Sequence, residues 1–93
     1  MARKSLTFDA DDVGITLECT LVFTDFDPTG ASAVLEVREQ PDRTMALTGP
    51  YSDVATYVVQ ADDFTPGYYE AQVRVSKGGV TISSESFLIV VTD

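Results

Sequence analysis

The sequence comprises 93 residues, of which 44% are hydrophobic and 23% charged, so it suffices for one folded domain and is not typical of a disordered chain. Its 15 acidic and 6 basic residues give a formal net charge of -9, so nucleic-acid and membrane partners are not expected. Without histidine and with one cysteine, the chain has no Ser-His-Asp or Cys-His catalytic arrangement, no typical zinc site and no internal disulfide.

The start of the chain, Met1 to Lys4, is basic, but no apolar segment of secretory length follows it. The longest apolar stretch, residues 87–91, is too short to span a bilayer. We therefore expect synthesis and folding in the cytoplasm of the producing cell, without secretion by a signal peptide.

The clearest strand signal covers residues 15–23, where apolar and polar side chains alternate with a period of two. Such alternation predicts a strand with one face buried and the other in water. The apolar positions are Ile15, Leu17, Cys19, Leu21 and Phe23. Because Cys19 belongs to this apolar set, we expect a small buried hydrophobe and not a reactive thiol.

Alternation also predicts strands over residues 33–38, 69–76 and 80–91. In the last of these the apolar parity changes, from even positions in the first half to odd positions from Phe87 onward. A strand exchanges its buried side only at a bulge or a break, and we place this break at residues 83–86. Such a break would allow the two halves to pair with different neighbours.

The strand predicted over residues 54–59 is apolar on both faces. Its inward side stays open, because Tyr57 with Val59 and Val54 with Val58 fit the alternation equally well. A strand with two apolar faces suits an edge that pairs with another chain.

Turn sequences separate these runs at short and fairly regular spacing. Residues 27–30 and 40–43 contain proline, and Gly78 with Gly79 supplies the positive φ of a hairpin. No segment has a sustained period of 3.6, so no helix longer than one turn is expected. Together these features predict a single domain over residues 1–93, an all-β, immunoglobulin-like antiparallel β-sandwich of about seven strands.

One local motif, Phe64-Thr-Pro-Gly-Tyr-Tyr69, is typical of a tyrosine corner. In that motif a tyrosine entering a strand bonds through its hydroxyl to the backbone just upstream. Tyr69 is expected to play this part because it shares the parity of the apolar residues that follow it. Pro66, Gly67 and Tyr69 are therefore the predicted fold-determining residues, and they indicate no function by themselves.

Three acidic groups in predicted loops raise the question of a calcium site. They are Asp9, Asp11 and Asp12; Asp25 and Asp27; and Asp62 and Asp63. Calcium binds carboxylate oxygens in such loops, and in a sandwich the first two groups would lie close together. No group has EF-hand spacing, and solvated loop carboxylates are the alternative. We expect neither a metal nor a cofactor.

Contact with other proteins is a better expectation than catalysis. Paired carboxylates can hydrolyse glycosides, but they need a concave site that a domain of this size rarely forms. Met45, Leu47 and Tyr51, in a stretch rich in proline and glycine, are expected to lie outside the sandwich. With Tyr57 they are the predicted protein-contact residues, and the alternative is that these segments roof the core.

The end of the chain carries an ordered set of motifs: Gly67-Tyr-Tyr69-Glu-Ala71, then Gly78-Gly79, Ser84 and the apolar residues 87–91. The start carries Asp12 and Gly14, a long alternating strand, then Asp25 and the pair Thr29-Gly30. From roughly residue 6 to residue 91, the sequence resembles the immunoglobulin-like N-terminal domain of phage baseplate upper proteins. In that family the domain begins a longer chain, whereas this sequence ends at Asp93.

The resemblance implies a bacteriophage virion structural protein that binds other virion proteins in a symmetric assembly. A tail, neck or baseplate part and a capsid decoration protein are both expected on this basis, and a homo-oligomer is among the possible states. The family pattern contributes no catalytic residues. The alternative from another class is a ligand-binding or adhesion module, calcium-dependent, that binds carbohydrate or a cell surface.

Overall fold

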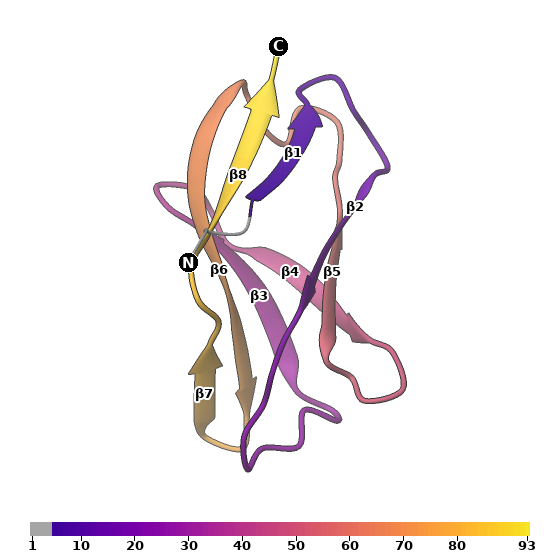
Figure 1. Cartoon of the computed structure of the whole chain (residues 1–93), viewed down its shortest axis with the longest axis vertical. Helices are drawn as coiled ribbons and strands as arrows, with labels where there is room; N and C mark the ends of the chain where they lie inside the picture. Colours follow the sequence, from indigo (N-terminus) through magenta and orange to yellow (C-terminus); the bar gives the residue numbers. More distant parts are fainter. Residues whose placement is uncertain (1–4) are drawn as a thin grey trace.

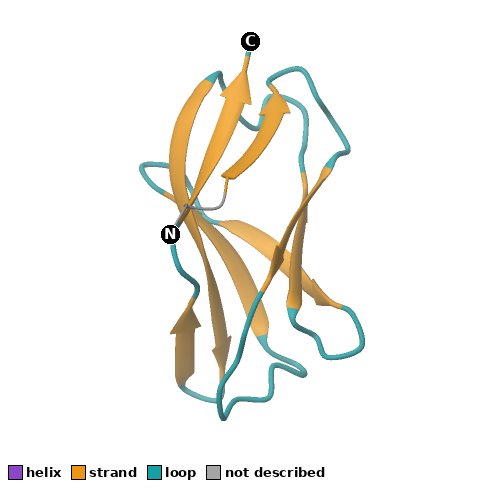
Figure 2. Ribbon diagram, viewed as in Figure 1, coloured by secondary structure: helices purple, strands orange, loops and turns teal. Residues whose placement is uncertain are grey.

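The computed structural model describes residues 5–93, which form eight β-strands joined by turns and contain no helix (Figure 2). The strands are β1 (Ser5–Asp9), β2 (Thr16–Thr20), β3 (Ser32–Val37), β4 (Arg43–Thr48), β5 (Val54–Val58), β6 (Gly67–Lys77), β7 (Val80–Ser83) and β8 (Phe87–Thr92). The all-β prediction is confirmed, with one strand more than expected. No membrane-spanning helix is found in this part of the chain. The basic start, Met1 to Lys4, lies outside the described residues.

The strands follow one another in the order β1-β8-β6-β3-β4-β5-β2, with β7 beside β6 (Figure 1). All neighbours are antiparallel except β1 and β8, which run parallel. The sheet is therefore mixed, which corrects the purely antiparallel expectation. It curves over on itself into a nearly barrel-shaped arrangement with an apolar interior.

The sheet turns over at β4, which changes its partner along its length. Residues 43–45 pair with β3, whereas residues 46–48 pair with β5. Strands that pass from one sheet to another form the corners of sandwiches and barrels. We call β1, β8, β6, β7 and β3 the first sheet, and β5 with β2 the second sheet; β4 belongs to both.

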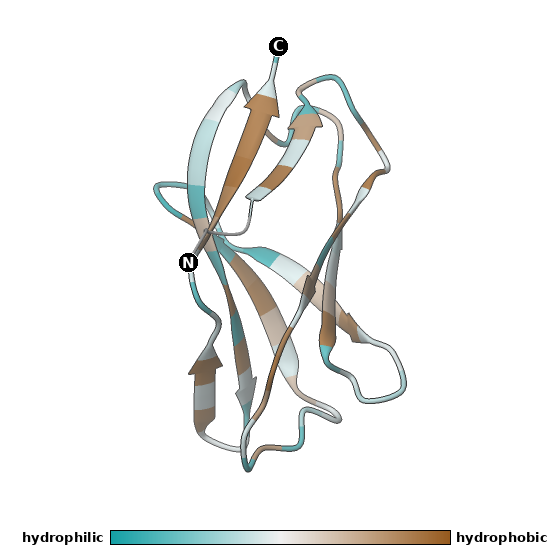
Figure 3. Ribbon diagram, in the orientation of Figure 1, coloured by the Kyte–Doolittle hydropathy of each residue, from teal (hydrophilic) through white to brown (hydrophobic). Residues whose placement is uncertain are grey.

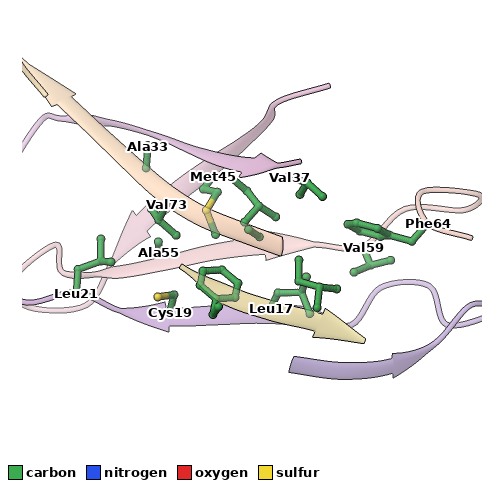
Figure 4. Close-up of a cluster of buried hydrophobic side chains, with 14 of the residues drawn as sticks. Leu17, Cys19, Leu21, Ala33, Val37, Met45, Ala55, Val59, Phe64 and Val73 are labelled. Atoms are coloured by element: carbon green, nitrogen blue, oxygen red, sulfur yellow. The ribbon is translucent and has the colours of Figure 1, made fainter. Parts of the chain in front are cut away.

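The long strand β6 supplies the centre of the core. Its alternate residues Ala71, Val73 and Val75 are buried, with the parity that the sequence predicts. Leu17 and Cys19 on β2 face the same interior, so the cysteine is a buried hydrophobe as expected (Figure 4). Strand β8, which lies between β1 and β6, has hydrophobic colour along most of its length (Figure 3). The most completely buried large side chains are Leu35, Val59, Val73, Val75 and Ile89.

The predicted break at residues 83–86 is present and separates β7 from β8. Both strands pair with β6, and β8 pairs in addition with β1. Between them, residues 84–86 lie opposite only residues 72–73, which makes a β-bulge. The Ser84 N–H donates to the Val73 carbonyl (2.8 Å), and the Ser84 Oγ accepts from the Val73 N–H (2.9 Å). A side-chain oxygen thus takes the place of a backbone carbonyl in the ladder.

Strand β5 lies between β4 and β2, so the expectation that this segment is a sheet edge is wrong. Its inward residues are Ala55 and Tyr57, continued by Val59, whereas Val58 is exposed. Both faces of β5 carry apolar residues because this strand lies between two neighbours in the sheet, with one face turned to the core and the other half exposed. The strands that end the sheet are β1, β2 and β7.

Candidate functional site

The acidic groups are used inside their own turns. In the first group, the Asp9 N–H donates to Asp12 Oδ2 (3.0 Å) and the Asp11 N–H donates to Asp9 Oδ1 (2.9 Å). In the second, the Thr29 N–H donates to Asp27 Oδ1 (3.0 Å) and lowers the pKa of Asp27. In the described part of the chain, no group of three or more His, Cys, Asp or Glu side chains is arranged to hold a metal ion.

The first two acidic groups lie at opposite ends of the molecule, which corrects the expectation that they lie close together (Figure 1). The turn after β1 is held against the end of β5, because the Gly14 N–H donates to the Val59 carbonyl (2.8 Å). The loop between β2 and β3, with Asp25 and Asp27, lies at the other end.

The third acidic group contributes to a polar cluster that we call the clasp, formed by Arg43, Tyr57 and Asp63. Arg43 Nε donates to Asp63 Oδ1 and Arg43 Nη2 donates to the Asp63 carbonyl, both at 2.9 Å. The Tyr57 hydroxyl and the Gln60 N–H donate to Asp63 Oδ2. The side chains of Arg43 and Asp63 are only 10% and 11% exposed, so water screens this ion pair weakly.

The clasp shifts the pKa of two of its members. Burial raises the pKa of Tyr57, and its hydrogen bond to Asp63 raises it further. Burial also acts to raise the pKa of Asp63, but the hydrogen bonds from Tyr57 and Arg43 outweigh burial, and the pKa is lowered. The carboxylate is thus ionised and the phenol protonated at neutral pH, which suits a structural ion pair and not a proton-transfer site.

Aromatic rings extend the clasp to the tyrosine corner. The guanidinium carbon of Arg43 lies 4.1 Å from the centroid of the Phe64 ring. Phe64 packs edge-on against Phe8 (5.5 Å) and Tyr69 (5.6 Å). The Tyr69 hydroxyl donates to the Thr65 carbonyl at 2.7 Å, so the hydrogen bond expected of the corner is present. This cluster ties β1, β4, β5 and β6 together.

The predicted contact residues divide into three kinds. Met45 is buried, and its assignment to the outside of the sandwich is wrong because β4 is a strand that turns this side chain inward. Leu47 and Tyr57 pack against the core, and the Tyr57 hydroxyl is engaged in the clasp, so neither is an outward contact. Tyr51, in the turn between β4 and β5, is 76% exposed.

The outer side of the second sheet presents small and hydroxylated side chains. Directly opposed residues share this side: Thr16 with Val58, Glu18 with Thr56, and Thr20 with Val54 on β2 and β5, and Ala46 with Thr56 and Thr48 with Val54 on β4 and β5. We call these residues the threonine-valine face. Only Glu18 carries a charge, although 23% of the whole chain is charged.

The outer side of the first sheet is different and carries ion pairs, so we call it the charged face. Arg74 bonds to Glu36 (2.8 Å) and lies 3.6 Å from Asp42, and Arg38 lies 3.6 Å from Glu70. A hollow of about 310 Å³ on this face is lined by four of these side chains, Glu36, Arg38, Asp42 and Glu70, together with Val37, Ala71, Gln72 and Ser86. Its charges are already paired within the chain.

An open groove of about 1170 Å³ lies between β2 and its extension on one side and the β7–β8 segment on the other. Here the two sheets do not meet, because β2 and β7 each have a single neighbouring strand. The apolar lining consists of Cys19, Leu21, Val22, Phe23, Val73, Val75, Ile82 and Phe87. The remaining lining residues are hydroxylated, except for Glu85.

No family model matches the sequence, and no curated protein sequence matches it. The threonine-valine face has a signal in the sequence, namely threonine at the polar positions of two alternating strands. The groove and the clasp have none, since each depends on which distant segments become neighbours.

Proposed function

We propose that the chain is an immunoglobulin-like domain and a non-enzymatic structural protein of a bacteriophage virion, in the tail or baseplate or as a capsid decoration. Its partners are other virion proteins in a symmetric assembly. Three features support the immunoglobulin-like assignment: β1 runs parallel to β8, β4 passes between the two sheets, and a tyrosine corner lies at the start of β6. The sequence resemblance supports the virion assignment.

The threonine-valine face is the observation that carries a contact function. Burying a charged side chain costs more free energy than burying a hydroxyl or a methyl group, and the centres of protein interfaces are poor in charge. A three-stranded surface with one charge, in a chain of net charge -9, therefore fits a protein partner better than permanent exposure to water. Tyr51 projects from the turn at the end of this face, and tyrosine is enriched among residues that dominate binding energy.

Quantitative mass spectrometry of purified virions tests the virion assignment. Peptides of this chain are counted against those of the major capsid protein. A copy number near that of the capsid protein supports a capsid decoration, and a small symmetric number supports a tail, neck or baseplate part. Absence of the chain from virions would overturn the proposal in favour of a binding module outside the particle.

A matched pair of variants tests the contact face. Tyr51→Lys should reduce incorporation into virions by about tenfold or more, because it places a charge at the proposed interface. Tyr68→Lys is the control, since Tyr68 is equally exposed (78%) but lies on the outer side of the first sheet. Both variants should melt within about 3 °C of the parent protein, because exposed substitutions change stability little. Equal incorporation of the two variants would contradict this assignment of the interface.

A further inference from the structure

Both walls of the groove between β2 and β7 are strand edges. The Leu21 N–H donates to the Asp53 carbonyl, so by alternation the backbone groups of Thr20 and Val22 point away from β5 and toward the open side. On the other wall, the Ser84 N–H donates to β6, so the backbone groups of Ser83 point away from β6. An uncovered edge of this kind is the part of a sheet to which an extended segment of another chain adds a strand.

The floor of the groove is part of the hydrophobic core. Val73, Val75 and Phe87 line the groove, and each is at most 3% exposed to solvent, so core residues form its floor. Val22, at its rim, is 90% exposed. Since the floor residues are already buried, an occupant gains free energy mainly by covering the exposed Val22 at the rim and by removing its own apolar side chains from water.

Negative charges predominate at and beside the groove, although Lys77 Nζ lies 3.1 Å from the Asp27 carbonyl oxygen. Glu85 is the only charged residue in the lining, and Asp25 and Asp27 lie in the loop that continues from β2. No cationic side chain lines it. An occupant with lysine or arginine on its outer side is thus complementary in charge.

The part of a second copy that the structure describes, residues 5–93, does not supply that complement. Among the described basic residues, Arg38, Arg43 and Arg74 form ion pairs within the chain, and Lys77 Nζ donates to the Asp27 carbonyl. Two copies would instead bring their acidic edges together, at a net charge of -9 each.

We propose that the groove binds an extended segment of another protein, which pairs with the outer edge of β2. Alternate side chains of the segment are apolar and lie on the groove floor, and the intervening ones include lysine or arginine that face Glu85. That the segment belongs to a virion protein rests on the function proposed above; the chemistry of the segment rests on the groove alone.

The test uses two synthetic peptides of about nine residues, the usual reach of a longer strand, with valine alternating with lysine in one and with glutamate in the other. Amide NMR spectra of the whole chain are recorded during titration. The valine-lysine peptide should shift the amide signals of Thr20, Val22 and Ile82 and bind about tenfold or more tightly than the valine-glutamate peptide.

Two modifications then locate the pairing edge. N-methylation of alternate backbone nitrogens of the peptide should abolish binding, because it removes the donors of a new ladder without altering the protein. Thr20→Pro should also abolish it, since this N–H points away from β5, whereas Thr81→Pro on the β7 edge should leave binding within about twofold.

Equal affinity for both peptides, indifference to N-methylation, amide shifts on another face, or self-association of the chain through the groove would each overturn the proposal. Peptide binding by a chain that is absent from virions would overturn the virion function and leave the groove proposal intact. A chain that is present in virions but shows no amide shift at β2 with millimolar peptide would overturn the groove proposal and leave the virion function intact.

Discussion

The outer sides of the two sheets, both exposed to water, differ in the kind of side chain that they carry. The charged face pairs its own charges, as in the contact of Arg74 with Glu36 at 2.8 Å, and it has little electrostatic complementarity left for a partner. The threonine-valine face has hydroxyl and methyl groups, which cost less free energy to remove from water than charged groups do. A strongly acidic chain can thus keep one surface available for contact by placing its charge in turns and on the opposite side.

Strand β4 contributes residues to both faces. The largest loss of stability is expected when the clasp is broken, because the clasp holds the start of this strand. Asp63→Asn removes the charge that Arg43 and Tyr57 share, and it should lower the free energy of unfolding by about 2–3 kcal/mol. In a domain of this size, that corresponds to a fall in melting temperature of about 10 °C or more. Asp62→Asn is the matched control, because Asp62 is exposed and the same carboxylate is replaced by the same amide. Similar melting temperatures for both variants would contradict the structural part assigned to the clasp.

The same residue gives the protein a dependence on acid. Because the pKa of Asp63 is lowered in the folded state, its stabilisation is complete above the usual value of 3.8 and is lost as the pH falls through the folded value. Thermal unfolding followed by circular dichroism between neutral pH and about pH 2.5 should show this loss. In Asp63→Asn the loss of stability at acid pH should be smaller than in the parent protein. An unchanged dependence of stability on pH would assign this loss to other carboxylates.

A smaller effect is expected on β6, whose neighbouring tyrosines face opposite ways. Tyr69→Phe removes the hydrogen bond to the Thr65 carbonyl and should cost about 1 kcal/mol. Tyr68→Phe, on the outer side, should cost less than about 0.5 kcal/mol. Denaturant unfolding with equal midpoints for the two variants would show that the corner hydrogen bond contributes nothing.

The smallest effect is expected on the charged face itself. Arg74→Gln removes the ion pair with Glu36. The side chains of Arg74 and Glu36 are 38% and 26% exposed, so the free energy of unfolding should fall by only about 0.5 kcal/mol at low salt. The difference from the parent protein should vanish near 1 M salt, where screening is nearly complete. Thr56→Val, on the threonine-valine face, should show no such salt dependence, and a salt-dependent result there would weaken the distinction between the faces.

Local patterns predicted much of this fold and little of its surface. The alternation of residues 69–76, the break at residues 83–86 and the corner at Tyr69 are local properties that the structure contains, whereas the strand predicted over residues 15–23 is shorter and covers only Thr16–Thr20. Strand β4 was not expected, because proline and glycine on both sides favour a loop, and so the burial of Met45 was missed.

The polar cluster and the groove could not be predicted for a different reason. Arg43 and Asp63 are 20 residues apart and meet only after β4 and the β5–β6 loop have been placed. The open groove depends on which strands remain at the ends of the sheet, which is a property of the order of all eight strands. Neither leaves a repeating pattern in the chain.

The parallel pairing of β1 with β8 also sets how the protein responds to pulling. These are the first and last strands of the described chain, they run side by side, and five residue pairs join them from Ser5–Leu88 to Asp9–Thr92. A tension applied at the two ends therefore slides one strand along the other and loads those hydrogen bonds together, whereas an antiparallel terminal pair would separate one bond at a time. Resistance to forced unfolding depends on the rate at which the chain crosses the barrier to unfolding. The parallel pairing of β1 with β8 therefore raises this resistance.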